Sequence, residues 1–284
     1  MSASHRPASE GPQAAPRVSY QGTVGAFSRL GIAAIFDSWI GIEQRSVAKV
    51  FESVEIGGSE FGVVPIENSH AGSINDTYDL LTRHGVTIVG EGTVRIKHCL
   101  MAPAGSDIST LTEVHSHPQA LEQCREFLES LDVRLVAEWD TAGAAEIVAE
   151  QGHHGVAAIA SAKAAEIYGL EILRVGIEDR TDNSTKFVGI AKSPTTLLGE
   201  PNKTSIVFAT ADVPGALSKV LEEFAKRDLN LSKLESRPSR MKAWQYHFYL
   251  DFDAAASDEK AQEALSSLAD HTSFLRVLGT YKSG

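Results

Sequence analysis

The chain has 284 residues, of which 43% are hydrophobic, and a formal net charge of −11 at pH 7. This length predicts two or three domains of roughly 100–150 residues each, and the composition supplies enough apolar side chains for their cores. The acidic balance provides no basic face for a polyanion, which argues against nucleic-acid binding. No apolar stretch approaches the roughly 20 residues that a membrane span needs, so no membrane protein is predicted.

The first 17 residues are rich in Ala, Ser, Pro and Gly and contain no apolar core. This composition predicts a disordered tail and not a secretory signal. The two cysteines, Cys99 and Cys124, are too few for a disulfide framework and indicate a reducing compartment. We therefore predict a cytoplasmic protein, or a plastid protein if the source is a plant or an alga.

Short apolar runs alternate with amphipathic helical patterns from residue 18 to residue 192. Alternating strands and helices predict an α/β domain with a largely parallel sheet. Gly152 and Gly169 stand where helices would stop, and Thr141 and Ser161 stand where N-caps belong. Examples of the expected strands lie at 61–66, 86–89, 135–136, 155–160 and 187–191, and the expected helices include 46–55, 118–131, 142–150 and 161–168.

One apolar strand pattern ends abruptly in three polar residues, Glu67, Asn68 and Ser69. In an open α/β sheet the ligand crevice lies beyond the carboxyl ends of the strands, where such side chains would project. The alternative is that Ser69 or Ser73 caps a helix over 75–81. The segment by itself leaves the choice between a site and a helix cap open.

A second polar cluster, formed by His115, Ser116 and His117, leads into a predicted helix. Gln123 lies two helical turns beyond Ser116, so the two side chains can lean toward one side. The alternative is that Ser116 or His117 caps the helix while Gln123 is solvated. The two histidines have no third ligand at a convincing spacing, and we predict no metal site.

A third polar cluster, at residues 182–187, precedes an apolar run and is by itself typical of a turn that enters a strand. Gly22 and Gly25 follow a strand pattern at 18–20 but lack the full glycine pattern and the Lys-Ser/Thr ending of a phosphate loop. No Gly-x-Ser-x-Gly elbow designates a nucleophilic serine. The sequence therefore predicts no cofactor. The three clusters offer hydroxyls, amides, one carboxylate and one cation, which suit binding of a small polar molecule.

Residues 193–202 have the composition of a linker, and the rhythm of the chain changes after them. Leu217, Val220, Leu221 and Phe224 recur at the spacing of one helix face. Strands are expected at 204–210, 229–236, 244–252 and 274–281, and helices after 215 and over 258–269. The order βαββαβ predicts a ferredoxin-like module of about eighty residues.

These three clusters, in this order and followed by this module, closely resemble the prephenate and arogenate dehydratase family. Its Val-Pro-Ile-Glu-Asn-Ser, Ser-His-Pro-Gln-Ala and Thr-Arg-Phe segments have counterparts at 64–69, 116–120 and 185–187. Two motifs of the family's C-terminal ACT regulatory domain match residues 215–218 and 235–238. The resemblance extends over about residues 17–282.

The resemblance implies a catalytic domain of two α/β lobes around a cleft, as in periplasmic binding proteins. The second lobe is expected at about 98–175, after which the chain returns to the first. The implied organisation is a disordered tail at 1–17, a catalytic domain at 18–192, a linker at 193–202 and an ACT domain at 203–284.

The resemblance further implies a lyase of phenylalanine biosynthesis that converts prephenate to phenylpyruvate with loss of carbon dioxide and water. The alternative is an arogenate dehydratase that gives phenylalanine directly. It stays open because the residues at 141–146, 157–162 and 274–279 look like those of plant arogenate dehydratases. By resemblance Thr185 is the catalytic hydroxyl. The further residues implied for the site are Glu67, Asn68, Ser116 and Gln123 around the reaction, and Ser69, Lys186 and Phe187 toward the substrate.

Lys186 departs from the family, which usually has arginine at this position. Lysine keeps the positive charge but loses the planar fork that grips a carboxylate with two hydrogen bonds. Three alternatives are a non-catalytic amino-acid sensor, an exported solute-binding protein, and a prephenate decarboxylase that does not aromatise. Thr185 disfavours the sensor, and the lack of a predicted signal peptide disfavours the solute-binding protein. Thr185 and the ACT-like module together disfavour the decarboxylase.

ACT domains of this family pair between subunits and bind phenylalanine at the interface, so the resemblance implies an allosteric effector and a homodimer or homotetramer. Neither a nucleic acid nor a membrane is an expected partner. The implied effector-binding residues are Gly215, Ala216, Leu217, Ser218, Glu235, Ser236, Arg237 and Pro238.

Overall fold

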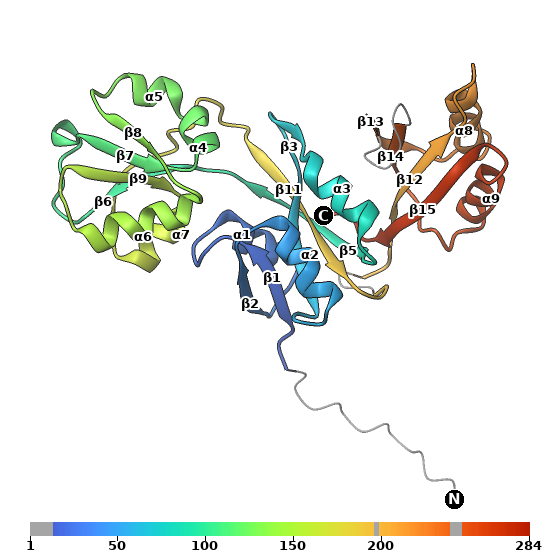
Figure 1. Ribbon diagram of the computed structural model, residues 1–284, viewed down its shortest axis with the longest axis horizontal. Coiled ribbons are helices and arrows are strands. Elements are labelled where there is room, and N and C mark those ends of the chain that lie inside the picture. Colours follow the sequence, from blue (N-terminus) through green and yellow to red (C-terminus); the bar gives the residue numbers. More distant parts are fainter. Residues whose placement is uncertain (1–13, 196–198, 239–245) are drawn as a thin grey trace, which may run out of the picture.

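The computed structural model describes residues 14–195, 199–238 and 246–284. Most of the predicted tail, residues 196–198 of the predicted linker and residues 244–245 of one predicted strand lie outside the described residues. Three bodies follow one another across the molecule (Figure 1), which we call lobe two, lobe one and the C-terminal module. Lobe one occupies the centre and contacts both of the others.

Lobe one is built on a mixed sheet with the strand order β5-β11-β3-β1-β2. β1 runs parallel to β2 and β3, whereas β11 runs antiparallel to β3 and β5. The sequence predicts a largely parallel sheet, but only half of these strand pairs are parallel. The strands are β1 (Arg17–Gln21), β2 (Ile40–Gln44), β3 (Phe61–Asn68), β5 (Thr87–Arg95) and β11 (Ser184–Ala191), and the short β4 (Gly72–Ser73) pairs with β3.

Both faces of this sheet are covered by helices, because its central strands are apolar on both sides. In β3, Val63 packs in the core under α1 (Phe27–Ala33), and Val64 packs in the opposite core under α2 (Val47–Glu55) and α3 (Asn75–Arg83). Ser46 caps α2, since its hydroxyl accepts from the Lys49 N–H at 3.3 Å. The proposed caps Ser69 and Ser73 are wrong for α3, whose N-cap residue is Ile74.

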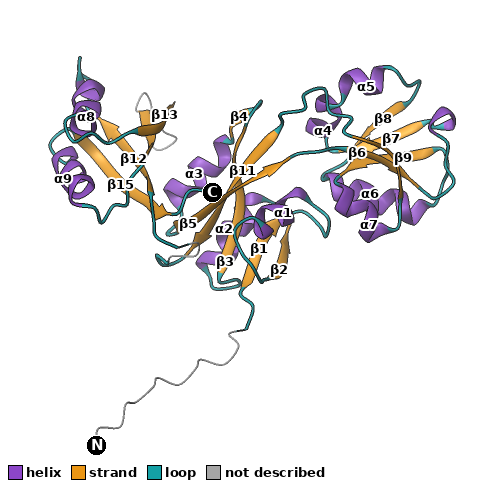
Figure 2. Ribbon diagram, turned by 180° about the vertical axis from the view of Figure 1, so that it is seen from behind, coloured by secondary structure: helices purple, strands orange, loops and turns teal. Residues whose placement is uncertain are grey.

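Lobe two has a five-stranded sheet in the order β10-β6-β9-β7-β8. The predicted helix over 118–131 is interrupted at Cys124. Helices α6 and α7 cover one face of the sheet, and α4 and α5 cover the other (Figure 2). The elements are β6 (Cys99–Ala102), η1 (Ile108–Thr110), β7 (Glu113–Ser116), α4 (Pro118–Gln123), α5 (Arg125–Glu129), β8 (Arg134–Ala137), α6 (Thr141–Gln151), β9 (Val156–Ala160), α7 (Ala162–Tyr168) and β10 (Glu171–Val175).

The helix boundaries of lobe two follow local side-chain chemistry. Gly152 and Gly169 end α6 and α7 in the left-handed conformation, as expected of C-terminal glycines. The Ser161 hydroxyl accepts from the Ala164 N–H at 3.1 Å, which confirms this cap. The cap of α6 is Asp140 and not Thr141, because a carboxylate oxygen of Asp140 accepts from the Ala142 N–H at 2.9 Å.

The C-terminal module has the predicted order βαββαβ and the sheet order β13-β14-β12-β15. One face of its sheet packs on α8 and α9, and Tyr249 and Tyr281 of the other face join the core of lobe one. The fold class predicted from the sequence is confirmed. The elements are β12 (Lys203–Thr210), α8 (Ala216–Ala225), β13 (Leu231–Pro238), β14 (Tyr246–Phe252), α9 (Glu259–Leu268) and β15 (Thr272–Tyr281).

Candidate active site

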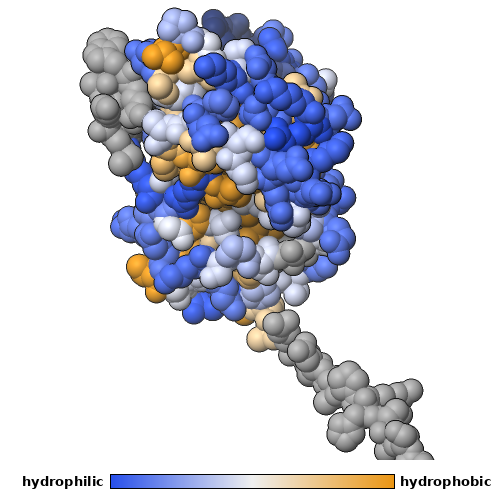
Figure 3. Space-filling model, turned by 90° about the vertical axis from the view of Figure 1, so that its right-hand side faces the viewer, coloured by the Kyte–Doolittle hydropathy of each residue, from blue (hydrophilic) through white to orange (hydrophobic). Residues whose placement is uncertain are grey.

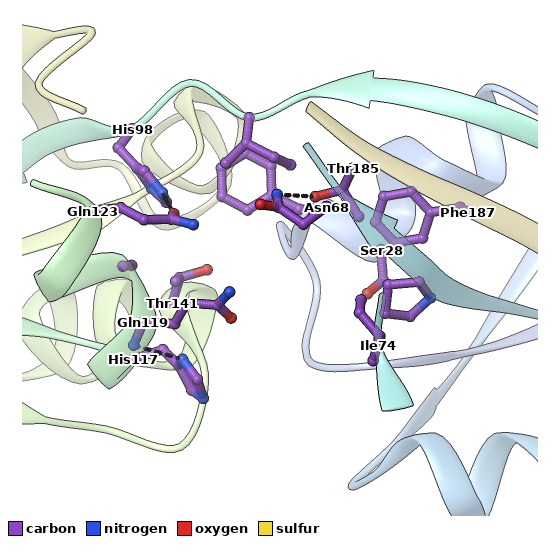
Figure 4. Close-up of a pocket in the computed structure, with 14 residues that line it drawn as sticks. Ser28, Asn68, Ile74, His98, His117, Gln119, Gln123, Thr141, Thr185 and Phe187 are labelled. Carbon is purple, nitrogen blue, oxygen red and sulfur yellow. Dashed lines mark hydrogen bonds between the residues drawn. The ribbon is translucent and has the colours of Figure 1, made fainter. Parts of the chain in front are cut away.

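A pocket of about 180 Å³ lies where the two lobes face each other. Lobe one contributes the end of β3, the start of β11 and the start of α1, and lobe two contributes α4 and the start of α6 (Figure 4). Of the predicted site residues, four line it: Asn68, Gln123, Thr185 and Phe187. The remaining lining residues are Phe27, Ser28, Pro65, Ile74, Ile96, His98, His117, Gln119, Ala120 and Thr141.

Asn68 and Thr185 face each other across neighbouring strands. The Asn68 amide nitrogen donates to the Thr185 hydroxyl oxygen at 3.0 Å and to the Asn183 side-chain oxygen at 2.8 Å. The Asn68 side-chain oxygen accepts from the backbone N–H groups of His70 and Ala71 at 3.0 and 2.9 Å. Asn68 is therefore fixed by the protein, and the Thr185 hydroxyl proton has no protein acceptor among the described residues.

A β-bulge in β3 brings these side chains to one face. Thr185 pairs with Asn68 and Phe187 pairs with Pro65, so two residues of β11 span three of β3. The bulge leaves one residue of β3 unpaired, and the side chains beyond it change to the other face of the sheet. Pro65 and Asn68 consequently line the pocket together with Thr185 and Phe187, as a regular strand of period two would not allow.

Four of the predicted site residues lie outside the pocket lining: Glu67, Ser69, Ser116 and Lys186. Lys186 pairs with Glu67 in the strand register, and its side chain lies on the opposite face of the sheet from those of Thr185 and Phe187. The Glu67 carboxylate lies 3.1 Å from the Lys233 ammonium of the C-terminal module. The Ser69 hydroxyl donates to the Asp182 carbonyl and accepts from the Ser184 N–H, which ties together the two segments that carry Asn68 and Thr185.

The Ser116 and Gln123 side chains have separate surroundings. Ser116 is fully buried in lobe two, where its hydroxyl donates to the Ile159 carbonyl at 2.6 Å, and it does not line the pocket. His117 is the N-cap residue of α4, since its ring nitrogen accepts from the Gln119 N–H at 3.2 Å. Gln123, at the end of α4, reaches the pocket.

Several lining residues were missed by the sequence reasoning, His98 and Thr141 among them. His98 opens the apolar run of β6, and a polar residue at the start of a buried strand was the signal available for it. Burial lowers the pKa of His98 despite a hydrogen bond to Gln123 and the nearby Glu178 carboxylate, so the ring is neutral near pH 7. The described lining residues include no carboxylate, lysine or arginine.

The loop at residues 22–25 holds the lobes against each other. Asp140 of lobe two accepts from the backbone N–H of Thr23 at 2.9 Å and from its hydroxyl at 3.3 Å. The Ser161 hydroxyl donates to the Gly25 carbonyl at 2.7 Å, and the Tyr168 hydroxyl donates to the Val24 carbonyl at 2.9 Å. The glycine pair that superficially looked like a phosphate loop thus serves as an inter-lobe contact.

The C-terminal module contacts lobe one through strand β13. Lys233 lies within 3.0 Å of the Ser73 hydroxyl, 3.1 Å of Glu67 and 3.6 Å of Glu235, and over the Tyr78 ring at 5.3 Å from its centroid. The predicted effector residues Glu235, Ser236, Arg237 and Pro238 lie on this same strand.

The other predicted effector segment surrounds the start of α8. Gly215 is its N-cap residue, with a φ of +78° that favours glycine, and Ala216, Leu217 and Ser218 form its first turn. Arg237 of the second segment lies 3.6 Å from Asp79 of lobe one. Among the described residues, no hydrogen bond or ion pair joins the two effector segments.

Two kinds of site find no support in the described ranges. No group of three or more His, Cys, Asp or Glu side chains there is arranged to hold a metal ion. His115 is engaged with Glu138 at 2.9 Å and with Glu113 at 3.4 Å. None of the described helices is long and apolar enough to cross a membrane.

Comparison with protein families gives two matches. The family model for prephenate dehydratase matches residues 18–195, and the model for the ACT domain matches residues 204–270. Arogenate dehydratase/prephenate dehydratase 6 of Arabidopsis thaliana, described as chloroplastic, is 44% identical over 282 residues, which cover 93% of this chain and 68% of that protein. Arogenate dehydratase 1 of Petunia hybrida is also 44% identical, over 93% of this chain and 66% of its own length. The chain thus spans about two thirds of these plant relatives.

Solved structures with the same fold cover nearly the whole chain. Prephenate dehydratase from Arthrobacter aurescens in complex with L-Phe has a TM-score of 0.84 at 29% identity, covering 94% of this chain and 90% of that one. GqqA, described as a novel type of quorum quenching acylase, also has a TM-score of 0.84, at 34% identity over 94% of this chain and 98% of that one.

Proposed function

This chain belongs to the prephenate dehydratase family, and we propose that it converts prephenate to phenylpyruvate with loss of carbon dioxide and water. The alternative substrate is arogenate, which would give phenylalanine directly. Either reaction makes the protein a lyase of phenylalanine biosynthesis. The observation that carries the proposal is the Thr185 hydroxyl, held by Asn68 in a pocket between two lobes.

The reaction makes the ring aromatic, which supplies the driving force. The ring carboxylate leaves as carbon dioxide, its bonding electrons enter the ring, and the hydroxyl on the opposite carbon leaves with a proton as water. Thr185 donates a hydrogen bond to this departing oxygen as it gains negative charge. A threonine is a weak acid, so hydrogen-bond stabilisation is physically easier than full proton transfer.

The surroundings of Thr185 suit this role. Asn68 donates to the hydroxyl oxygen, so the hydroxyl proton is left for another acceptor, and Thr185 lines the pocket where a substrate could supply one. The apolar side chains of Phe27, Ile74 and Phe187 line the same pocket and limit the water around a bound substrate. A carboxylate that loses hydration there is more easily lost as neutral carbon dioxide.

The amide of Gln123 is the proposed partner of a substrate oxygen on the lobe-two side of the pocket. Glu67, Lys186 and Ser69 lie outside the lining, and we propose that they act through the strands that carry Asn68 and Thr185. Ser116 similarly supports the sheet beneath α4.

One experiment separates the two substrates. The purified protein is incubated with prephenate or with arogenate, and phenylpyruvate and phenylalanine are both measured over time. We expect phenylpyruvate from prephenate. Formation of phenylalanine from arogenate at a much higher kcat/KM would establish the alternative substrate, and no aromatic product from either compound would refute the proposed lyase activity.

The similarity to GqqA supports a second candidate, hydrolysis of an acylated signalling molecule. Such a reaction uses an activated nucleophile. The pocket hydroxyls of Ser28, Thr141 and Thr185 make no hydrogen bond to a histidine among the described residues. The same assay with an N-acyl amide in place of prephenate tests this candidate, and release of the free acid at a rate above that with prephenate would favour it.

We further propose that phenylalanine binds the ACT domain at 203–284 and regulates the catalytic domain at 18–192, with residues 193–202 as the linker. The structure of a relative with bound L-Phe supports this proposal. The backbone N–H groups at the start of α8, near Gly215, would face the ligand carboxylate, and the segment at 235–238 would complete the pocket. Calorimetry tests the binding, and Gly215→Asp and Ser236→Asp should weaken it without removing basal activity.

A homodimer or homotetramer, paired through ACT domains, is the proposed assembly. Figure 3 views the molecule from the side of α8, α9 and β15, and apolar side chains gather in the middle of that otherwise hydrophilic face. The exposed large apolar residues in the described part of this domain are Val213, Leu234, Tyr246, Phe274 and Val277. Sedimentation of the purified chain tests the assembly.

The cytoplasm, or the plastid of a plant or an alga, is the proposed location. Cys99 and Cys124 are both buried free thiols, and burial raises their pKa values and so disfavours the reactive thiolates. Cysteines that are not joined in a disulfide suit a reducing compartment. Fractionation of the source cells with an antibody to the chain tests the location.

A further inference from the structure

His98 lies in the segment through which the chain passes from lobe one into lobe two. Its side chain is only 2% exposed, and its ring meets the Phe27 ring edge-on, with centroids 5.4 Å apart and planes at 84°. The backbone N–H of His98 donates to the Glu178 carboxylate at 2.9 Å. The backbone carbonyl of His98 accepts from the Gly176 N–H at 2.9 Å. Glu178 and Gly176 belong to the segment that returns to lobe one, so the returning segment holds His98 in the outgoing one.

The two ring nitrogens of His98 have different surroundings. Nε2 lies 2.9 Å from the Gln123 side-chain oxygen. Nδ1 is enclosed and has no hydrogen-bond partner among the described residues. An enclosed N–H without an acceptor is costly and rare in folded proteins, whereas an acceptor without a donor is found somewhat more often. The single proton of the neutral ring therefore belongs on Nε2, which donates to Gln123.

This hydrogen bond decides which end of the Gln123 amide faces the pocket. With its oxygen held by His98, the amide turns its nitrogen away from the histidine, as Figure 4 shows. The two N–H groups of that nitrogen have no acceptor among the described residues. They are suited to a substrate carboxylate or carbonyl oxygen. A flipped amide would instead present its oxygen, which repels a carboxylate.

We propose that His98 is a positioning residue that holds the Gln123 amide as a hydrogen-bond donor toward an oxygen of the substrate. The inference rests on the proposed function, because it assigns the lobe-two contact of the same reaction. His98 would act on the substrate through Gln123 and would not transfer a proton itself. The returning segment contributes to this arrangement, since the Gln123 carbonyl accepts from the Asp179 N–H at 2.8 Å.

A double-mutant cycle tests this role. His98→Leu should lower kcat/KM by about 10-fold to 100-fold, mainly through KM, because the amide is no longer oriented. His98→Gln, which keeps an N–H donor of similar reach, should recover most of the loss. In a Gln123→Ala background, His98→Leu should change kcat/KM by less than about 2-fold, since the group it positions is absent. Independent, additive losses would overturn the proposal.

The matched control is His115→Leu. His115 is a buried histidine of the same lobe whose hydrogen bonds go to Glu138 and Glu113, outside the pocket. We expect a comparable loss of thermal stability from both substitutions but a change in KM from His98→Leu alone. Equal KM effects from the two variants would show that the effect of His98 is general and would refute the positioning role.

Nitrogen-15 NMR of the imidazole supplies a readout that does not depend on turnover. We expect a signal from a neutral ring that is protonated at Nε2, and a signal from a ring protonated at Nδ1 would overturn the inference. If the chain turned over neither prephenate nor arogenate, the proposed function would fail. The NMR result would still decide how His98 and Gln123 are paired.

Discussion

The Asn68 amide nitrogen lies 3.0 Å from the Thr185 hydroxyl oxygen, across two strands whose register places the residues directly opposite each other. Both side chains are buried, with exposed fractions of 5% and 8%. Because Asn68 supplies the donor, Thr185 has to send its own proton to a different acceptor. The pair converts an ordinary hydroxyl into one with a defined direction, which is what stabilisation of a departing oxygen requires.

The first prediction concerns the Thr185 hydroxyl. Thr185→Ala should lower kcat by about 100-fold or more, because the departing oxygen loses its donor while most substrate contacts remain. Thr185→Ser keeps the hydroxyl and should retain far more activity. Steady-state kinetics with the preferred substrate measures both variants. A Thr185→Ala enzyme with near-normal kcat would remove this residue from the catalytic role.

The second prediction concerns Lys186. The strand register places it opposite Glu67, on the face of the sheet away from the pocket. We therefore expect Lys186→Met to change KM by less than about 2-fold, since no substrate anion would lose its partner. Lys186→Arg serves as the control that keeps the charge. A large rise in KM for the methionine variant alone would mean that the ammonium reaches the substrate after all.

The third prediction concerns the ion pair between Glu67 and Lys233, whose charged atoms are 3.1 Å apart. Glu67 directly precedes Asn68, and Lys233 lies two residues before Glu235 of the predicted effector segment. Lys233→Met should leave the activity without effector nearly unchanged. It should reduce the coupling free energy between phenylalanine and substrate by about 0.5–2 kcal/mol, because a link between the two domains is lost.

Substrate kinetics at a series of phenylalanine concentrations measures that coupling. Lys163→Met is the matched control, since Lys163 pairs with Glu166 on the surface of α7, within lobe two. Unchanged phenylalanine regulation in the Lys233→Met variant would show that the ion pair with Glu67 does not contribute to the coupling between phenylalanine and substrate.

The fourth prediction concerns acid stability of the ACT domain. Hydrogen bonds from Lys226 and Arg227, at 2.7 and 2.8 Å, lower the pKa of Glu223 to about 2. A carboxyl with a folded-state pKa below its unfolded value adds stability above the unfolded pKa and loses it as the pH falls toward the folded pKa. Glu223→Gln should therefore lower Tm at pH 7, and the difference from wild type should shrink as the pH falls from about 4.5 toward 2.

Thermal unfolding followed by circular dichroism at several pH values measures this difference. Glu263→Gln is the control, because Glu263 meets the same Arg227 at 3.3 Å from a position where its side chain is 59% exposed. A Glu223→Gln penalty that does not change with pH would contradict the assignment.

The fold class and many of the elements could be predicted from local patterns of residues. Local patterns are decisive for helix ends such as Ser161 and Gly169, because a cap is formed by residues a few positions apart. The βαββαβ order of residues 203–284 follows from apolar periodicity in the same way. The motifs at 64–69, 116–120 and 185–187 are local sequence features, and they are enough to indicate the family.

Which side of each strand those motifs use depends instead on how the sheets and lobes pack. A bulge in β3 turns Pro65 and Asn68 to the same face as Thr185, while Glu67 meets Lys233. His98 became part of the pocket because the chain crosses between lobes there, beside a glutamine 25 residues away. A bulge and a contact between distant segments depend on how whole sheets pack, and no local pattern of residues records that packing.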